Sequence, residues 1–475
     1  MRRLGLKDAA IAALVLAVAL AAAGPAAART YKLRVGPIDM GGYQVRLDTT
    51  AAAAPKVNGY ITRMRAFLTD AAGHPMPVKR VMLHHALFLD RGRRDGDRRD
   101  GTCPGTPRER FYGTGEEHSE LRLPAGYGIP IRRGERWQSS WMVMSHQLNP
   151  ERAFIEYDVT VATRRKLTPV KAFWLDVTGC RGSVQYDVPG GGRPGATNSK
   201  SIAWTVPEDG RLVAGGAHLH GGAEGLRLLQ PRCHNRVLAD SRPLFGLPDN
   251  VVYHVFPVLH EPGPISTSWF TTATGIPVAK GERITAQALY DGELPHAAVM
   301  AVDHVYMAPG GRPPGRCARL PRDLVNANAP LPGRTRSPQV TVPLTSIGPT
   351  GAAVTIDRPP GPITPLGGSA TIAVRDFAFD NPNLSIPLGA SLSWRFLDTV
   401  RHNVTFANGP QAFSSLYLRA GKTFSHRFTK PGTYRLFCSL HPISMHEVVD
   451  VRPAAEPLPP APLARNSAGS GTVHW

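Results

Sequence analysis

Near its C-terminal end the chain reads Phe437-Cys438-Ser439-Leu440-His441-Pro442-Ile443-Ser444-Met445, and His402-Asn403-Val404 precedes it. One thiol, one imidazole and one thioether thus lie close together in the chain, with a second imidazole further upstream. Cu(I) favours soft sulfur ligands and Cu(II) favours imidazole, so a thiolate, two imidazoles and a weak axial thioether serve both oxidation states. The pattern predicts a mononuclear copper electron-transfer site, with the loop folded over the metal and the upstream histidine on a neighbouring strand.

The residues before this loop have the pattern of β-strands. Residues 423–428 alternate like a strand, Lys430-Pro431-Gly432 is typical of a turn, and residues 433–437 form a second strand that runs into Cys438. A strand that ends at the thiol fits the geometry that the metal site requires.

The stretch from about Gly367 to Arg452 resembles the cupredoxin family, which includes plastocyanin- and amicyanin-like proteins. The resemblance rests on a D-x3-H-N-V segment at Asp398 to Val404 and on a P-G-T-Y-x3-C-x2-H core at Pro431 to His441. It implies a cupredoxin β-sandwich with type 1 copper bound by His402, Cys438, His441 and Met445. The spacer between the loop histidine and the methionine differs by one residue from those usual in the family, which leaves His446 as an alternative axial ligand.

The first three hundred residues show two-residue alternation and little helical periodicity. In residues 154–161 the apolar side chains fall on one face and the polar ones on the other. Many short strands, with turns supplied by 48 glycines and 45 prolines, favour an all-β fold of sandwiches.

Histidines gather at three places in this region: an H-H pair at His84 and His85, His146, and an H-x-H at His218 and His220. The H-x-H spacing places both imidazoles on one face of a strand, which suits two cis ligands of one metal. Adjacent residues point to opposite faces, so the H-H pair can bind one metal only where the strand is bulged or twisted. For a lone histidine the alternative is a solvated or core side chain.

The order H-H, H and H-x-H, followed by Met300, resembles the copper type II ascorbate-dependent monooxygenases. That family includes the peptidylglycine α-hydroxylating and dopamine β-hydroxylating enzymes. The R-L-P-x-G-x-G stretch at residues 122–128 adds to the resemblance, which covers roughly Val35 to Pro309. It implies two jelly-roll β-sandwiches that face each other across a solvent-filled cleft, and up to two type 2 coppers.

The resemblance also implies ligands and a substrate class. An electron-transfer copper would be bound by His84, His85 and His146. The copper where oxygen is activated would be bound by the catalytic set His218, His220 and Met300, with Met307 or His304 as alternatives to the methionine. Gly216 stands where amidating enzymes carry an arginine that anchors a peptide carboxylate. A glycine-extended peptide is therefore not the expected substrate.

The predicted domain order is a signal peptide (1–28), a first monooxygenase-like β-sandwich (29–168), a second (169–320), a Pro/Gly-rich linker (321–366), a cupredoxin domain (367–453) and a disordered tail (454–475). The charged, apolar and small-residue order of residues 1–28 is typical of a secretory signal. Arg2-Arg3 is either its positive start or part of a twin-arginine signal. We expect a secreted, periplasmic or cell-surface protein without a membrane span after signal removal.

Cysteine count and charge add further limits. With Cys438 on copper, four cysteines remain for two disulfides with three possible connectivities: Cys103, Cys180, Cys233 and Cys317. Cys103 could instead be a free thiol. The net charge of +19 comes mostly from arginine, and the charged clusters mix both signs, so we expect solubility or attraction to anionic surfaces or partners, and no nucleic-acid partner.

Two functions remain open from the sequence. The first is an exported copper-dependent monooxygenase-like enzyme that takes molecular oxygen, an unknown small organic substrate and electrons from an ascorbate-like or protein donor through the fused cupredoxin domain. The second is a non-enzymatic exported copper-binding or electron-transfer protein. A multicopper oxidase is disfavoured, because its trinuclear cluster requires histidines beside the cysteine, and here the neighbours of Cys438 are Phe437 and Ser439.

Overall fold

The chain is built almost entirely from β-strands. The computed structural model describes residues 28–92, 101–103, 109–163, 166–181, 183–311, 315 and 317–453. Within these ranges the helical elements are two short 3-10 helices, η1 (Pro231–Cys233) and η2 (Val251–His254). The predicted all-β class is confirmed. Nearly all of the predicted signal peptide and the whole predicted tail lie outside the described residues. No helix in the described part of the chain is long and apolar enough to cross a bilayer.

The first β-sandwich is formed by ten strands: β1 (Ala28–Met40), β2 (Val45–Ala52), β3 (Gly59–Thr69), β4 (Val81–Asp90), β5 (Glu109–Gly115), β6 (Leu121–Arg122), β7 (Tyr127–Ile131), β8 (Trp137–Ser145), β9 (Glu151–Ala162) and β10 (Thr168–Pro169). Its outer sheet has the order β1-β9-β3-β7-β10, with β6 beside β3, and its inner sheet has the order β2-β8-β4-β5. The alternation predicted for residues 154–161 is present in β9, where Ile155, Tyr157, Val159 and Val161 are fully buried.

The second β-sandwich follows directly in the chain. Its strands are β11 (Lys171–Asp176), β12 (Gln185–Val188), β13 (Thr197–Thr205), β14 (Gly210–Leu219), β15 (Ala223–Gln230), β16 (Arg236–Ser241), β17 (Pro243–Leu244), β18 (Ser266–Thr267), β19 (Trp269–Val278), β20 (Arg283–Asp291), β21 (His296–Pro309) and β22 (Val325–Ala327). One sheet has the order β11-β21-β14-β19-β22, with β12 beside β21, and the other has the order β13-β20-β15-β16.

The two sandwiches pack through the sheets that carry the histidine motifs. The hydroxyl of Tyr306, on β21, donates a hydrogen bond to the carbonyl of Phe111, on β5, at 3.0 Å. One continuous apolar cluster includes Phe111 of the first sandwich and Val213 of the second. Strand β4 with the H-H pair and strand β14 with the start of the H-x-H are therefore held on facing sheets.

Both expected disulfides are present. Cys103 pairs with Cys180 and so joins a loop of the first sandwich to the second, with the two Cα atoms 5.1 Å apart. Cys233 pairs with Cys317, with a Cα separation of 5.5 Å. Cys438 is the free cysteine and is buried.

The third β-sandwich contains β25 (Thr364–Pro365), β26 (Ala370–Arg375), β27 (Ala378–Phe379), β28 (Asn383–Pro387), β29 (Ser391–Phe396), β30 (Thr405–Asn408), β31 (Thr423–Arg427), β32 (Gly432–Phe437) and β33 (His446–Arg452). Its sheets have the orders β25-β28-β33-β32-β30 and β27-β26-β29-β31. The predicted strands before the cysteine loop are β31 and β32, which follow each other in sequence but lie in different sheets. Their alternating apolar residues contribute to one core that includes the fully buried Trp394.

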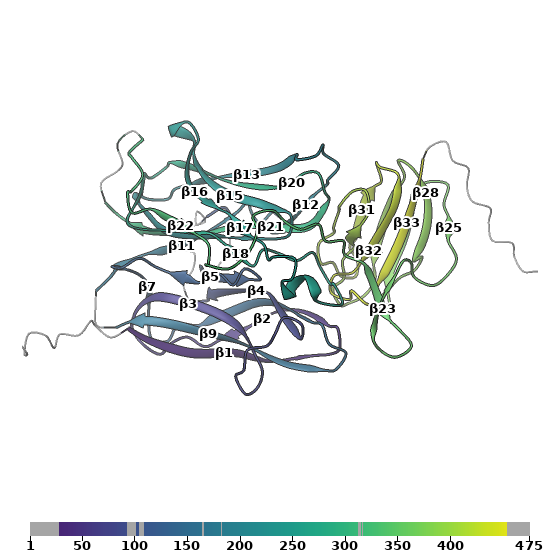
Figure 1. Ribbon diagram of the computed structural model, residues 1–475, viewed down its shortest axis with the longest axis horizontal. Helices are drawn as coiled ribbons and strands as arrows, with labels where there is room; N and C mark the ends of the chain where they lie inside the picture. The colour runs from purple at the N-terminus through teal and green to yellow at the C-terminus, as the bar shows by residue number, and fades with distance from the viewer. Residues whose placement is uncertain are drawn as a thin grey trace, which may run out of the picture.

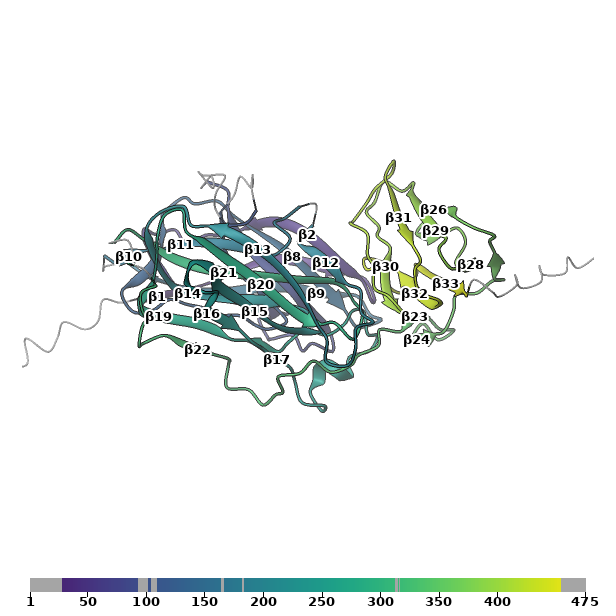
Figure 2. The ribbon, with the colours of Figure 1, turned by 90° about the horizontal axis from the view of Figure 1, so that it is seen from above.

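The third sandwich lies at one end of the stacked first two in both views (Figures 1 and 2). The segment expected to be an extended linker, residues 321–366, contains β22, which pairs with β19, and the hairpin of β23 (Leu344–Ile347) and β24 (Ala353–Ile356). Leu344 is buried in a cluster with Phe437 and Val448 of the third sandwich. The connection therefore packs against the domains that it joins.

Candidate metal centres

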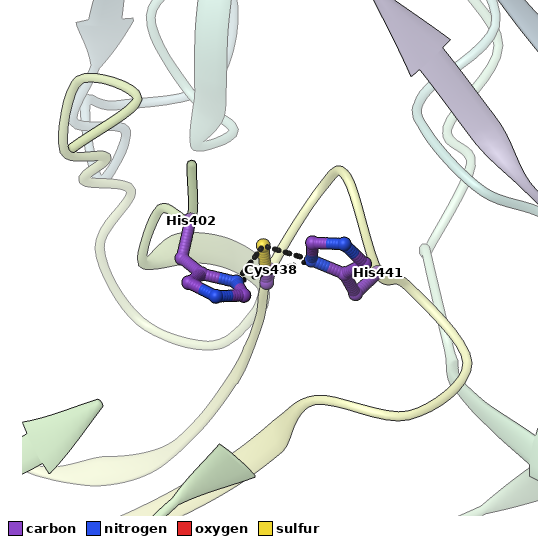
Figure 3. Close-up of side chains that lie close together, drawn as sticks. All are labelled: His402, Cys438 and His441. Atoms are coloured by element: carbon purple, nitrogen blue, oxygen red, sulfur yellow. Dashed lines mark hydrogen bonds between the residues drawn. The ribbon is translucent and has the colours of Figure 1, made fainter. Parts of the chain in front are cut away.

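The first candidate centre lies in the third sandwich. His402 precedes β30, Cys438 follows β32 directly, and His441 lies on the loop between β32 and β33. Figure 3 shows the two imidazoles on either side of the sulfur. The Sγ atom lies 4.0 Å from Nδ1 of His402 and 3.5 Å from Nδ1 of His441, and the two Nδ1 atoms are 3.1 Å apart. Three donor atoms of the type that a type 1 copper needs therefore converge on one point.

The surroundings prepare these side chains for a cation. Nε2 of His402 lies 2.8 Å from Oδ2 of Asp398, the contact by which a carboxylate orients a ligating imidazole. The backbone N–H of Asn403 donates to the Cys438 sulfur at 3.4 Å. Burial raises the pKa of the Cys438 thiol to about 11 and lowers the pKa of His441 to about 4. The imidazole is neutral and can bind a metal, whereas the thiol needs a cation nearby to become a thiolate.

The axial position has two candidates from the sequence. Met445 is fully buried, and its backbone N–H donates to the carbonyl of His441 at 3.1 Å. His446 begins β33, and its Nε2 lies 2.8 Å from the carbonyl oxygen of Pro442. This contact takes up one ring nitrogen of His446, whereas Met445 lies in the same buried cluster as Cys438, which favours Met445.

A second group of histidines lies between the first two sandwiches. The register of β4 against β8 shifts between Leu83 and His85, which is the irregularity that the H-H pair was predicted to need. The ring centroid of His84 lies 5.3 Å from that of His85, 5.0 Å from His220 and 4.8 Å from His260. His218 lies 5.2 Å from His220 and 6.4 Å from His85. We call these five side chains, His84, His85, His218, His220 and His260, the histidine cluster.

Two carboxylates of the first sandwich hold the rings of this cluster. Glu116 Oε1 lies 2.7 Å from Nδ1 of His84 and 2.5 Å from Nε2 of His260. Glu117 Oε2 lies 3.0 Å from Nδ1 of His218. A ring nitrogen bound to a carboxylate leaves the other nitrogen free for a metal, as in most protein sites with histidine ligands.

Ring nitrogens that are free to bind a metal are present in the histidine cluster and beside it. Buried ring nitrogens without a hydrogen-bond partner among the described residues include Nδ1 of His85 and His260, and Nε2 of His146, His218, His220 and His304. An unpaired polar atom in the interior is costly, so a set of this size in one region fits a site for a cation. The residues present therefore fit a metal centre.

The pKa values of the cluster histidines shift in two directions. Burial, with His84 and His218 nearby, lowers the pKa of His85 well below its ordinary value, and burial with the same neighbours does so for His220. Burial also acts to lower the pKa of His218 and His260, but the charges and hydrogen bonds of Glu117 and Glu116 outweigh it and raise both. Histidines without a carboxylate are thus held neutral, the form that binds metal.

The remaining predicted residues lie around the cluster. Nδ1 of His146 lies 3.0 Å from the carbonyl oxygen of Pro257, and its ring has no contact with the rings of His84 or His85 among the described pairs. Met300 lines a cavity together with His85, His218 and His304, whereas Met307 is buried in the second core. His260, Glu116 and Glu117 were not among the residues predicted from the sequence. The adjacent carboxylates Glu116 and Glu117 directly after β5 were the available signal.

The ligand loop of the third sandwich packs close to the histidine cluster. Leu440 and Ile443 contact a cluster of Val45, Met82, Met142, Met144 and Leu259. A cavity of about 100 Å³ is lined by His84, His220 and His260 on one side and by Tyr417 and Ser439 on the other. The hydroxyls of Tyr417 and Ser439 are 3.4 Å apart. The residue after Cys438 thus reaches the same small cavity as the cluster.

Comparison with known proteins gives matches to the third sandwich. Residues 367–452 match a family described as copper binding proteins of the plastocyanin/azurin family. Amicyanin-alpha of Methylorubrum extorquens strain AM1 is 32% identical over 85 residues, which are 17% of this chain and 71% of the relative. Amicyanin of Paracoccus denitrificans is 26% identical over 85 residues, 17% of this chain and 65% of the relative. Amicyanin of Paracoccus versutus is 23% identical over 129 residues, 25% of this chain and 98% of the relative.

Proposed function

The chain belongs, through residues 367–452, to the plastocyanin/azurin family of copper-binding proteins, and on this premise we propose that it is an exported copper oxidoreductase that passes electrons from a type 1 copper to copper at the histidine cluster. Membership in this family implies copper binding and electron transfer for the third sandwich. His402, Cys438, His441 and Met445 would hold that copper. The histidine cluster would receive its electrons.

One observation carries the proposal: the start of the ligand loop of the third sandwich lines the same cavity as the cluster. Ser439 is bonded to Cys438 and lines that cavity with His84 and His220. The amide of Asn403 fixes this residue, because its side-chain oxygen accepts from the Ser439 N–H at 2.8 Å. A short and rigid connection between two candidate metal centres is what intramolecular electron transfer needs.

The docking of the third sandwich keeps this connection in place. Asp187 of the second sandwich accepts hydrogen bonds from the Ser414 amide at 3.0 Å and from its hydroxyl at 2.7 Å. Nζ of Lys430 donates to the carbonyl of Gly190 at 3.2 Å. The contact between the third sandwich and the others is thus made by polar pairs at its rim and by Leu440 and Ile443 nearer the cluster.

Copper at the cluster would supply the reduction of molecular oxygen, and the finer proposal is hydroxylation of a small organic substrate. Such a reaction takes one C–H bond, O2, two electrons and two protons, and yields the alcohol and water, so an ascorbate-like or protein donor must supply the electrons. A cavity of about 500 Å³ beside His85, His218 and Met300 has the size of a small-molecule site. Leu47, Leu87 and Trp174 line it beside Arg110 and Arg401, which favours a substrate with a large apolar part and a polar group.

The test combines a copper count with oxygen consumption. The purified full chain should bind more than one copper, with one EPR signal of narrow hyperfine splitting and the others of ordinary type 2 character. Cys438→Ser should abolish oxygen consumption with a protein donor while sparing it with a strong chemical reductant. Ser444→Ala, an exposed change on the same loop, should leave both unchanged.

Equal rates of Cys438→Ser and the parent chain with a protein donor would overturn the electron-transfer route. The second function is a non-enzymatic copper-binding or electron-transfer protein, which the small volume of the cavity at His84 and His220 favours. In that case the copper count would stand, and oxygen would not be consumed with any reductant.

A further inference from the structure

We propose that the histidine cluster holds two metal ions, and that each is bound by histidines of both sandwiches instead of one ion belonging to each sandwich. One centre joins His84 of the first sandwich to His220 and His260 of the second. The other joins His85 of the first sandwich to His218 of the second. That the ions are copper rests on the proposed function, whereas the crossed pairing rests on the geometry alone.

The first centre follows from the ring positions around His84. Two imidazoles that bind one metal at about 2.0–2.1 Å and near a tetrahedral angle place their ring centroids about 5 Å apart. The centroids of His220 and His260 lie 5.0 Å and 4.8 Å from that of His84. Nε2 of His220 and Nδ1 of His260 are buried and without a hydrogen-bond partner among the described residues. These three rings also line one cavity.

The second centre lies on the other side of the same two strands. The rings of His85 and His218 are 6.4 Å apart, which is wider than the spacing of about 5 Å for two imidazoles at a tetrahedral angle, so one metal between them requires the rings to move closer together. Nδ1 of His85 and Nε2 of His218 are buried and unpaired among the described residues. Both line the cavity that also contains Met300 and His304. A third ligand can come from Met300 or from Nε2 of His304, which is buried and unpaired as well.

Ring spacing alone does not select this pairing, because His84 and His85 are 5.3 Å apart, and His218 and His220 are 5.2 Å apart. The cavities decide it. His84 and His85 open into different cavities, and so do His218 and His220, because the bulge in β4 and the end of β14 direct the members of each pair to opposite sides. Each cavity therefore receives one histidine from each motif.

The supporting carboxylates also contact histidines across the two sandwiches. Glu116 and Glu117 both belong to the first sandwich. Glu116 contacts His84 of its own sandwich and His260 of the second, and it also accepts the backbone N–H of Gly263 at 2.9 Å. Glu117 contacts His218 of the second sandwich. Filling either centre would therefore tie the two sandwiches together.

The number of copper ions lost from double variants distinguishes the two pairings. In the full chain carrying Cys438→Ser, which removes the type 1 copper, Cu(II) bound per chain is measured after reconstitution and removal of free metal. Crossed pairing predicts that His84→Ala with His220→Ala loses one copper, and that His84→Ala with His85→Ala loses two. Pairing by sandwich predicts that the His84/His85 variant loses one copper and that the His84/His220 variant loses two. His74→Ala, an exposed histidine, should lose none.

Folding and the proposed function are tested separately. Each variant is compared by near-UV circular dichroism, and His→Gln replacements at the same positions repeat the count if an alanine variant does not fold. Loss of one copper from the His84/His85 variant, or of two from the His84/His220 variant, would overturn the crossed pairing and leave the proposed function standing. A Cys438→Ser chain that binds no Cu(II) at all would overturn both. Crossed pairing with no oxygen consumption would overturn the enzymatic proposal alone.

Discussion

The two candidate metal regions are built in opposite ways. The ligands of the third sandwich come mostly from one loop, since Cys438, His441 and Met445 are close in sequence and only His402 comes from elsewhere. The histidine cluster draws on β4, on the end of β14 and the residue after it, and on the segment that follows η2, in two sandwiches. A loop carries its own geometry, so its motif defines a site. A site between sandwiches depends on how the sandwiches pack, and no motif encodes that.

The largest expected effect tests whether the two regions are independent. Cys438→Ser removes the one thiolate of the first centre, so its absorption and its narrow EPR signal should be lost completely. Copper at the histidine cluster should be retained, because none of its proposed ligands lies in the third sandwich. The measurement is copper per chain together with EPR. Loss of the cluster copper as well would mean that the two centres form together, which would break the contrast.

The next largest effect concerns a glycine that only the histidine cluster needs. A Cβ atom at Gly115 would lie 2.7 Å from the backbone oxygen of His84 and 2.8 Å from Cε1 of His218. Gly115→Ala should therefore displace both motifs, lower the free energy of unfolding by roughly 1–3 kcal/mol and reduce copper at the cluster. Chemical denaturation and the copper count measure this.

The matched control for this change lies in the other region. Gly367→Ala should be neutral, because a Cβ there meets nothing within 4 Å. The type 1 EPR signal should be the same in both variants. A Gly115→Ala chain with full copper at the cluster would mean that the rings tolerate displacement, and the packing argument for the cluster would fail.

The same contrast explains what the sequence could predict. The two strands before Cys438 and the nearness of Cys438 to His441 followed from residues close in the chain, and the H-N-V segment marked the more distant His402. The H-H and H-x-H motifs were assigned to two separate groups, one in each sandwich. The proximity of His84 to His220 and His260 across the sandwiches was not predicted, since it depends on the bulge in β4 and on the facing of two sheets. His260 lies in a loop, where no periodicity marks a ligand.

A smaller effect concerns the carboxylates that orient the cluster. Glu117→Gln removes the charged partner of His218 but keeps the size of the side chain, so the affinity of one cluster copper should fall by about 10–100-fold. Competition with a chelator of known affinity measures it. Glu120→Gln is the control, because Glu120 pairs with Arg63 and Arg122 at the surface. Equal affinity in the two variants would contradict an orienting role for Glu117.

The smallest effect concerns the contact that joins the two regions, at Asp187. Burial raises the pKa of this carboxyl above 3.8, although hydrogen bonds from Ser414 and the amide of Ala298 oppose the rise. A raised pKa in the folded state means that the stabilisation is complete below the unfolded value and is lost as pH rises through the folded value. The chain should therefore lose a little stability from about pH 4 upward. Asp187→Asn, which cannot ionise, should flatten this part of the profile in thermal unfolding across the acid range. An unchanged profile would assign the pH dependence to other groups, and the joint between the two regions would then be insensitive to the charge of Asp187.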